Sequence, residues 1–399
     1  MKGPDAYKRY KRTYAHDGAE PIWSEWELDV DNLAQKVEDI EARLDGVELV
    51  SWKSVQDIVR AGRAAEIFSV GDRLVCEHSE YGLLEWTVIG VDQDTPTDES
   101  LSHSLTLQLE NAIPAVQFDA PEALFCINSA LSAGAPYTFT ANSTTLNFTP
   151  TVAVPAGAVA VFPYFDYTNI TDTPLTIYET PADTEPLLTL SVNSGTLGSS
   201  LNATYNNVNR ARYGSSNWMQ SAIRQFLNSE AEAGSVWLPK NNYDRPPKWV
   251  NNTAGFLNGM DEDFLSVIGN VQKPTFVTPL DNGPAVFENT EKFFLPAVTE
   301  VFGSDYRTCE LSEGESYTYY KVNSSNTSNS ISADKNRIVY YNGEIAFCLL
   351  RSPHYQEEQK YQYRTCNINK KGGIDSIYSC HDFSSNDPNV VIKPCCCIV

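Results

Sequence analysis

The feature that most restricts the fold is a long stretch without positive charge. Residues 74–209 contain no Lys or Arg, although they contain fifteen Asp and Glu. They are rich in Thr, Ala, Pro, Gly and Asn, and residues 137–140 and 146–149 alternate between apolar and polar side chains. Alternation with period two predicts strands that bury one face, and Pro-Ala-Gly at 155–157 predicts a turn. We therefore expect residues 111–200 to form a β-sandwich-like or jelly-roll-like insert.

Helix and strand patterns flank this insert. Ser51 is expected to cap an amphipathic helix that ends at Gly62, because Ser favours the N-cap and Gly the position after the last turn. A second helix is expected from Asn217 or Ser216 to Ser229, with a short third helix over residues 263–268. Strands are expected over residues 68–75 and 85–91, and over 153–162 and 187–192 in the insert.

A heptad pattern precedes the first of these helices. Its apolar residues are 3, 4, 3, 4 and 3 positions apart, which is the a/d spacing of a coiled coil. Because the pattern lasts only about two and a half heptads, two interpretations stay open: a helix packed on its own chain, or a short oligomerising stalk, with a trimer favoured. The expected oligomerisation residues are Val30, Leu33, Val37, Ile40, Leu44 and Val47.

Charge and hydropathy argue against several partners. A net charge of −22 disfavours nucleic acid, since phosphate contacts need clustered Lys and Arg, and it disfavours an anionic membrane surface. No run of about 18 apolar residues is present, so no membrane insertion is expected. Residues 1–14 are basic and polar and are not followed by an apolar run, so no secretory signal is expected either.

The nine cysteines lack the spacing of a metal site. No two of them form a Cys-x-x-Cys pair, and their number is odd, so we expect buried, reduced thiols. Three adjacent cysteines, Cys395 to Cys397, predict a buried terminal strand. The five histidines stand in no recognisable frame with a nucleophile, and no zinc-protease, P-loop or hydrolase-elbow motif occurs. We expect no catalytic residues, no metal site and no cofactor.

One group of motifs carries a family resemblance. Residues 212–229 read RYGSSNWMQSAIRQFLNS, and they are followed by FFLP at 293–296, FCLLRSP at 347–353 and VVIKPCC at 390–396. This order resembles an uncharacterised family of gut bacteria and their phages, whose members carry YGSNNW…SAIRQWLNS, FLPS, YWLRSP and VRPA elements. Residues 50–95 also resemble that family. The chain differs from the pattern at Phe347 and Cys348, where the family has Tyr-Trp, and at Lys393 and Cys395, where it has Arg and Ala.

That family looks like a relative of the formylglycine-generating-enzyme-like branch of the C-type lectin fold. Phage tropism determinants and the variable proteins of diversity-generating retroelements use the same branch. The resemblance therefore implies an α+β fold class: a C-type-lectin-like C-terminal domain, the β-sandwich-like or jelly-roll-like insert, and a short N-terminal helix. The expected division is an attachment arm (1–29), the heptad helix (30–50), a first part of the lectin-like region (51–110), the insert (111–200) and the ligand-binding domain (201–399).

The same resemblance implies a function in host attachment. The chain is expected to be a phage adhesin, or receptor-binding protein, made in the host cytoplasm and carried on the virion, where diversity-generating retroelements can vary such a face. Its partners would be a host cell-surface protein or glycan and, through the arm, other virion proteins. The alternative is a structural head-fibre, capsid-decoration or tail protein without a receptor role.

The C-terminal composition suits a binding face. Ten of the 21 tyrosines lie after residue 303, among many Ser and Asn. Tyr supplies stiff contact area while Ser and Asn supply adaptable hydrogen bonds, as in antibody paratopes. We expect about half of the candidate residues to be exposed. The candidate ligand-binding residues are His354, Tyr355, Gln356, Tyr361, Tyr363, Arg364, Asn367, Tyr378, His381 and Phe383.

Overall fold

The computed structural model describes most of the chain after residue 50 and four short strands before it. The described residues are 10–11, 14–16, 21–23, 27–28, 51–119, 125–141, 144–161, 169–170, 174–180, 182–183, 185–196, 216–238, 246–279, 283–303, 312–321, 335–354, 364–375 and 390–399. The heptad stripe from Val30 to Val47 lies outside them.

The expected α+β, C-type-lectin-like fold class is wrong. About 39% of the described residues lie in strands and 18% in helices, and the strands are divided among many small sheets. One reason is that the expected helix from residue 217 to 229 is broken. Ser221 has an extended backbone, with ψ 150°, and it separates η2 (Trp218–Gln220) from α5 (Ala222–Leu227). Ser221 caps the second piece instead of continuing the first.

One of two six-stranded sheets has the order β18-β27-β8-β6-β5, with β21 also paired to β27. Its last strand in sequence, β27, is an interior strand that pairs antiparallel with three neighbours. The expectation of a buried terminal strand at the three adjacent cysteines is confirmed. The strands are β5 (Arg73–His78), β6 (Gly82–Val91), β8 (Leu105–Leu109), β18 (Ile268–Gly269), β21 (Phe293–Phe294) and β27 (Cys395–Ile398).

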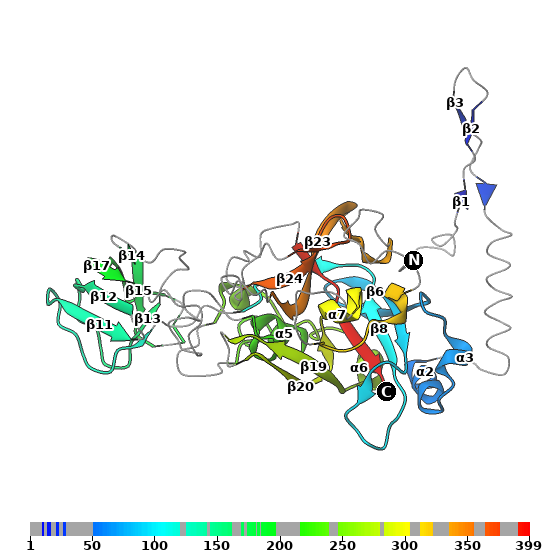
Figure 1. The fold of residues 1–399 in the computed structure, drawn as a ribbon, viewed down its shortest axis with the longest axis horizontal. Helices are drawn as coiled ribbons and strands as arrows, with labels where there is room; N and C mark the ends of the chain where they lie inside the picture. The colour runs from blue at the N-terminus through cyan, green and yellow to red at the C-terminus, as the bar shows by residue number, and fades with distance from the viewer. Residues whose placement is uncertain are drawn as a thin grey trace.

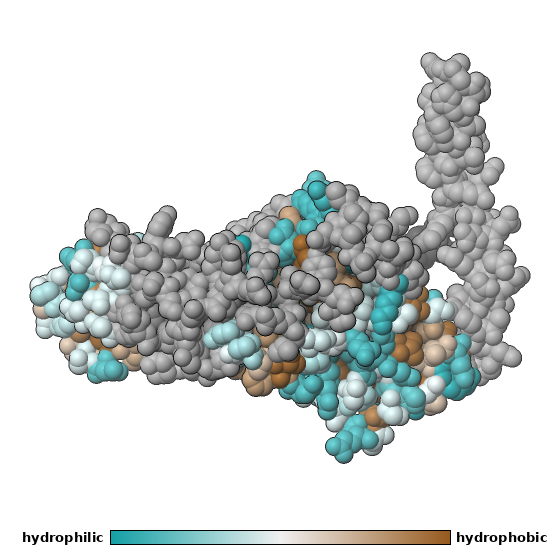
Figure 2. All heavy atoms as spheres, viewed as in Figure 1, coloured by the Kyte–Doolittle hydropathy of each residue, from teal (hydrophilic) through white to brown (hydrophobic). Residues whose placement is uncertain are grey.

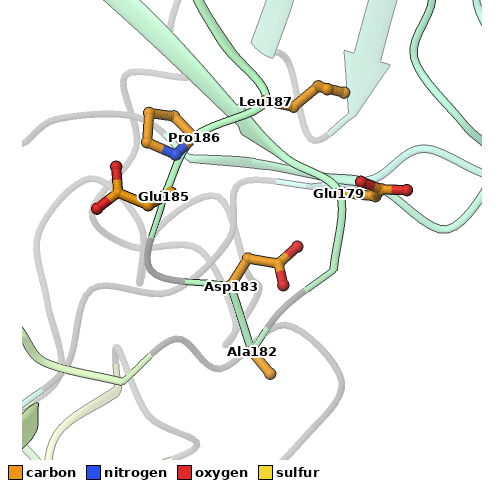
Figure 3. A pocket seen from close by; sticks show the side chains of 6 residues that line it. All are labelled: Glu179, Ala182, Asp183, Glu185, Pro186 and Leu187. Carbon is orange, nitrogen blue, oxygen red and sulfur yellow. The ribbon is translucent and has the colours of Figure 1, made fainter.

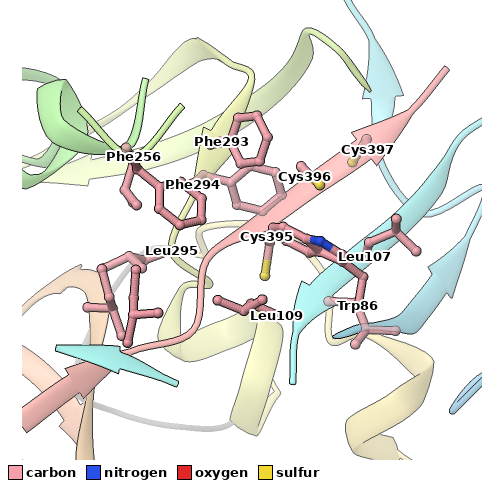
Figure 4. Close-up of a cluster of buried hydrophobic side chains, with 14 of the residues drawn as sticks. Trp86, Leu107, Leu109, Phe256, Phe293, Phe294, Leu295, Cys395, Cys396 and Cys397 are labelled. Carbon is pink, nitrogen blue, oxygen red and sulfur yellow. The ribbon is translucent and has the colours of Figure 1, made fainter. Parts of the chain in front are cut away.

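Aromatic and aliphatic side chains fill the space around β27. Burying such side chains is the main favourable term in folding, at roughly 25 cal/mol per Å². Trp86, Phe293 and Cys396 are all fully buried there. Figure 4 labels Trp86, Leu107, Leu109, Phe256, Phe293, Phe294, Leu295, Cys395, Cys396 and Cys397 in this cluster.

The first long helix packs on the end of β27. α2 (Trp52–Arg60) begins at Ser51, whose side chain accepts a hydrogen bond from the Ser54 amide, and Gly62 follows with φ +70°. The expected N-cap and C-terminal glycine are confirmed. The Gln56 Nε2 atom donates to the Val399 backbone oxygen at 2.8 Å. The Trp52 ring lies 4.7 Å from the Phe264 ring of α6 (Glu262–Val267).

A second six-stranded sheet contains the C-terminal candidate residues. Its order is β25-β24-β23-β26-β9, and β22 also pairs with β23. The β23–β26 pair is parallel and the other pairs are antiparallel. The strands are β9 (Ile113–Pro114), β22 (Val339–Tyr341), β23 (Glu344–Pro353), β24 (Thr365–Ile368), β25 (Ile374–Asp375) and β26 (Val390–Ile392).

The insert has two four-stranded sheets and a hydrophobic core of its own. The sheet orders are β10-β13-β15-β16 and β11-β12-β17-β14. The strands of these sheets that Figure 1 labels, β11 to β15 and β17, lie together as a group. Leu146, Leu175 and Ile177 are fully buried in that core. The strands are β10 (Phe125–Cys126), β11 (Tyr137–Ala141), β12 (Thr144–Phe148), β13 (Val159–Val161), β14 (Asn169–Ile170), β15 (Pro174–Tyr178), β16 (Leu188–Ser191) and β17 (Ser194–Thr196).

The remaining elements are short. A three-stranded sheet has the order β20-β19-β7, and the arm contains the pairs β1–β4 and β2–β3. Those strands are β1 (Tyr10–Lys11), β2 (Tyr14–His16), β3 (Pro21–Trp23), β4 (Glu27–Leu28), β7 (Thr95–Pro96), β19 (Val271–Val277) and β20 (Ala285–Glu291). The other helices are α3 (Ala64–Ile67), η3 (Lys248–Asn252), α7 (Val298–Phe302), α8 (Thr318–Lys321) and η5 (Lys335–Arg337).

Candidate binding surface at one end of the C-terminal sheet

Strand register places the starts of two Tyr-containing segments at the same end of one sheet. Pro353 of β23 lies opposite Thr365 of β24, and Leu349 lies opposite Asn367. β25 is also antiparallel to β24, with Asp375 opposite Asn367. Hence β23 and β25 run in the same direction, and the chain leaves both strands toward the same end of the sheet. Residues 355–363 follow the first strand and residues 376–389 follow the second.

Strand pairing joins the two residues that flank the first segment, 355–363. The His354 amide donates to the Arg364 carbonyl at 2.8 Å, one step beyond the Pro353–Thr365 pair. The Cys366 Sγ atom lies 3.6 Å from the Pro353 carbonyl oxygen. The two residues that flank segment 355–363 are therefore fixed to each other by backbone bonding.

One asparagine stabilises the turn between β24 and β25 with hydrogen bonds to its backbone. Asn369 Oδ1 accepts from the Lys371 amide at 2.9 Å and from the Gly373 amide at 3.1 Å. The Asn369 amide in turn donates to the Gly373 carbonyl at 2.7 Å. Asn side chains that bond the backbone a few residues on replace a backbone turn contact. This turn sets the register of β25 and so the position from which residue 376 begins.

Strand β23 is anchored in the interior immediately before this end. The Arg351 side chain is fully buried and donates to the Leu295 carbonyl at 2.9 Å and the Glu313 carbonyl at 3.0 Å. Its guanidinium forms an ion pair with Glu300 at 2.5 Å. The neighbouring Ser352 hydroxyl accepts from the Val298 amide at 2.8 Å and contacts the Glu313 carboxyl. Two consecutive residues of β23 are therefore held in place by buried groups on other segments of the chain.

A continuous polar network extends from this anchor. Lys273 of β19 contacts Glu300 and forms an ion pair with Asp94 at 2.5 Å. Its ammonium group donates to the Tyr317 hydroxyl at 2.8 Å, and that hydroxyl donates to Asp94 at 2.9 Å. Burial alone would raise the pKa of Asp94, but the charge of Lys273, with the hydrogen bonds to the carboxylate, outweighs it and lowers that pKa. Burial would lower the pKa of Lys273, but Asp94 and Glu300 raise it.

This network joins parts of the chain that are distant in sequence. Asp94 follows β6, Lys273 lies on β19, Glu300 on α7 and Arg351 on β23. All of these side chains are at most 8% exposed. Acidic and basic groups are thus present together, but a substrate in solvent cannot reach them. The arrangement fixes strand positions and supports no general acid–base chemistry at the surface.

The candidate residues divide into three groups. The structure places His354 and Asn367 in the interior, at 5% and 0% exposure, and leaves Arg364 half-buried. Residues 348–353 of β23 and all four residues of β24 are buried, so a polar residue there does not face solvent as it would on a half-exposed strand. The others lie outside the described residues: Tyr355, Gln356, Tyr361, Tyr363, Tyr378, His381 and Phe383.

The sequence analysis did not identify the buried charged residues that fix the position of β23. Arg351 follows directly on the apolar run FCLL, and that position was the available signal, whereas Lys273 lies among polar residues in VQKPTF and gives none. Lys and Arg are almost never fully buried unless they are paired. The two carboxylates that pair with Lys273, Asp94 and Glu300, carry no such signal, because each lies in an ordinary polar context.

An acidic hollow in the insert is a separate feature. It has a volume of about 450 Å³ and lies between β15 and β16, lined by Glu179, Ala182, Asp183, Glu185, Pro186 and Leu187. Figure 3 shows the carboxyl group of Glu185 directed away from those of Asp183 and Glu179. Among the described residues no group of three or more His, Cys, Asp or Glu is placed to hold a metal ion.

Comparison with known proteins gives a family. The chain belongs to the family described as "Domain of unknown function (DUF6273)", whose family model matches residues 187–399. No curated protein and no solved structure matches the chain. In the part of the chain that the structure describes, every helix is too short or too polar to cross a membrane.

Proposed function

We propose that this chain is a phage virion-associated receptor-binding protein that recognises a host-surface protein or glycan with its C-terminal region. The observation that carries the proposal is the common exit of two Tyr-containing segments from one end of the C-terminal sheet, set by the register of β23, β24 and β25. Segments that leave the same end of a rigid sheet can form one contact surface.

The buried contacts of β23 lower the entropic cost of binding. Binding is weakened when contact residues lose conformational entropy, and residues that leave a fixed strand have less of it to lose. Here Arg351 and Ser352 hold β23 immediately before residue 353, and the His354–Arg364 backbone bond closes the first segment. Tyr side chains on such a base supply large contact area with few rotatable bonds. The proposal involves no catalysis, metal or cofactor.

Binding to whole cells tests the proposal. The purified full chain is added to a panel of gut-bacterial cells beside the variant Tyr355→Ala/Tyr361→Ala/Tyr378→Ala. Truncating aromatic residues at the centre of an interface typically costs 2 kcal/mol or more, so we expect at least about a thirtyfold loss of affinity. The matched control is Tyr340→Ala, because Tyr340 is 58% exposed and pairs with Ile345 near the opposite end of β23.

The outcomes separate the two functions considered for the chain. Binding lost in the triple variant but kept in Tyr340→Ala, with unchanged thermal unfolding of both, supports a receptor-binding face at this end. Equal binding by all three proteins moves the receptor site elsewhere on the chain. Absence of binding by the wild type across the panel favours the structural head-fibre, decoration or tail role.

A further inference from the structure

One buried lysine lies between two carboxyl groups in the interior of the chain. Lys273 of β19 is 2% exposed, and its ammonium nitrogen lies 2.5 Å from Asp94 Oδ1 and in contact with Glu300 Oε1. Most charged side chains lie on the surface, as the hydrophilic residues in Figure 2 do. An amine and a carboxyl group that are held together away from water are the two reactants of an amide bond.

The backbone places these two reactants beside each other. β7 pairs antiparallel with β19, and Thr95 lies opposite Gln272. Asp94 and Lys273 are the next residues along this pair, and their side chains meet. A carbon–oxygen bond of a carboxyl group is about 1.2 Å long, so the Asp94 carboxyl carbon lies at most about 3.7 Å from the lysine nitrogen. This is close to the separation of about 3–3.5 Å from which reacting atoms attack.

The second oxygen of Asp94 has the hydrogen-bond donors that such an attack needs. Asp94 Oδ2 accepts from the Thr106 hydroxyl at 2.6 Å and from the Tyr317 hydroxyl at 2.9 Å. Attack on the carboxyl carbon places negative charge on this oxygen, and donors that already point at it stabilise that charge. The centre of the Phe294 ring lies 4.5 Å from the lysine nitrogen and gives the group an apolar wall. Exclusion of water strengthens these interactions and protects an amide from hydrolysis.

Glu300 is placed to transfer a proton and is the poorer target for attack. Its Oε1 atom contacts the Lys273 nitrogen, and Arg351 donates to both of its oxygens. The Ala297 amide also donates to Glu300 Oε2 at 2.7 Å. A carboxylate that is bound by a guanidinium group accepts a proton but resists attack by an amine, because it carries negative charge. The contacts therefore assign different roles to the two carboxyl groups beside Lys273.

We propose that Lys273 and Asp94 form an intramolecular amide bond after the chain has folded. The ammonium group first transfers a proton to Asp94 Oδ1, which gives a neutral amine and a carboxylic acid. The amine nitrogen then attacks the carboxyl carbon, and Glu300 transfers a second proton from the nitrogen to Oδ1. The bond from the carboxyl carbon to Oδ1 breaks, and one water leaves. The ion pair and its products, the amide and water, have the same atoms and no net charge, so the step needs no other reactant.

The bond joins two segments that enclose the insert. Lys273 and Asp94 are 179 positions apart, and the strands of the insert, from residue 125 to 196, lie between them in sequence. Closing so long a loop lowers the entropy of the unfolded chain, and replacing two buried charges by a neutral amide removes their desolvation cost. Despite burial, the pKa of Asp94 is lowered and that of Lys273 is raised by their mutual charges, so the neutral reactants are a minor population and the bond forms slowly. This cross-link is independent of the proposed receptor site.

Intact mass spectrometry of the denatured full-length chain tests the bond. After prolonged incubation in the folded state, the wild type should be lighter than its sequence mass by one water. A protease digest should then contain a branched peptide in which residue 94 is joined to residue 273. Lys273→Met and Asp94→Ala each remove one reactant, so both variants should keep their full sequence mass. The matched control is Lys393→Met, which removes another buried lysine, paired with Glu110 at 3.4 Å, and should leave the loss of water unchanged.

The rate of bond formation tests the role of the glutamate. Glu300→Gln keeps the shape of the side chain but cannot accept a proton, so the loss of water, followed after refolding, should slow about a hundredfold or more in the folded fraction. An unchanged rate would contradict that role. The wild type needs no variant to decide the main question. A wild-type chain that keeps its full sequence mass, or a loss of water that Lys273→Met retains, would overturn the proposal.

Discussion

Three carboxyl groups and two cations lie buried beside β23: those of Asp94, Glu300 and Glu313, with Lys273 and Arg351. An uncompensated charge in such a place costs several kcal/mol, so the charges must nearly balance. Two cations balance two carboxylates if Glu313 keeps its proton. Burial is the main cause that raises the pKa of Glu313, against the lowering effect of Arg351. We therefore infer that Glu313 is the neutral member of the group.

Exchange of each glutamate for glutamine tests this assignment. Glu313→Gln replaces one neutral group by another of the same shape, so the free energy of unfolding should change by about 1 kcal/mol or less. Glu300→Gln leaves Lys273 and Arg351 with too little negative charge, and it should lower that free energy by about 3–5 kcal/mol. Chemical denaturation measures both. Equal destabilisation by the two substitutions would contradict a neutral Glu313.

The same residue gives a pH dependence. The pKa of Glu313 is higher in the folded chain than its ordinary value of 4.5. The folded state then binds the proton more tightly than the unfolded state, so this contribution to stability is complete below 4.5 and declines as the pH rises through the folded pKa. Glu313→Gln cannot ionise. Unfolding free energies measured in a pH series should therefore favour the variant increasingly over the wild type as the pH rises, and a constant difference would argue against the raised pKa.

The buried thiols give a chemical prediction at the same scale. Burial raises the pKa of Cys76 and of Cys348 to about 12, and it raises the pKa of Cys395, Cys396 and Cys397 well above the ordinary value for a thiol. The thiolate is the reactive form, so these five should stay unmodified when the folded chain meets iodoacetamide. Half-buried Cys126 is the internal comparison and should react faster. Mass spectrometry of labelled peptides, beside a denatured sample, measures each site; labelling of the terminal strand at the rate of Cys126 would contradict the burial.

At the scale of helices and strands, an element could be predicted where its local sequence signals agree with its tertiary packing. The helix from Trp52 to Arg60 could be predicted because Ser51 and Gly62 give its limits and Val55, Ile58 and Val59 give its buried face. The terminal cysteine strand could be predicted from its uniform small apolar residues. The break at Ser221 could not, because Ser is a good cap but is also tolerated inside a helix. The fold class was wrong for a different reason: it came from motif order, which says nothing about how many residues between motifs are strands.

The candidate site shows the same division between local and distant information. Composition identified the Tyr-rich segments, but no local pattern shows that β23 and β25 run in the same direction, because that depends on pairing across β24. Nor does any local pattern show that Asn367 is fully buried. Its side-chain amide has no hydrogen-bond partner among the described residues. Leaving a buried polar group unsatisfied costs about 1–3 kcal/mol.

That cost predicts opposite effects for two asparagines of the same hairpin. Asn367→Leu removes the unsatisfied amide and should raise the free energy of unfolding by about 1–3 kcal/mol. Asn369→Leu removes the two hydrogen bonds that close the turn to β25 and should lower it by about 1–2 kcal/mol. Denaturant titration of both variants decides. Destabilisation by Asn367→Leu as large as that by Asn369→Leu would mean that the Asn367 amide has a polar role after all.

On the scale of the whole molecule, the chain has two hydrophobic cores. The larger surrounds β27 and draws on residues from Val55 to Val399, so the first and last described parts of the body share one core. The smaller belongs to the insert, whose strands pair only with one another in the described part of the chain. A unit with its own core and its own sheets can unfold by itself, whereas residues in a common core unfold together.

Separate cores predict separate unfolding. Leu175 and Leu107 are both fully buried, the first in the core of the insert and the second in the core around β27. Replacing either by Ala should cost about 2–5 kcal/mol. Leu175→Ala should shift only the calorimetric transition of the insert, and Leu107→Ala only that of the body, because neither cavity touches the other core. Hydrogen exchange with mass spectrometry assigns each transition: after Leu175→Ala the loss of protection should stay within the strands from β10 to β17. If that loss spread to β8 and β27, the two cores would form one cooperative unit, and the insert would then help to hold the base of the C-terminal sheet instead of being carried by it.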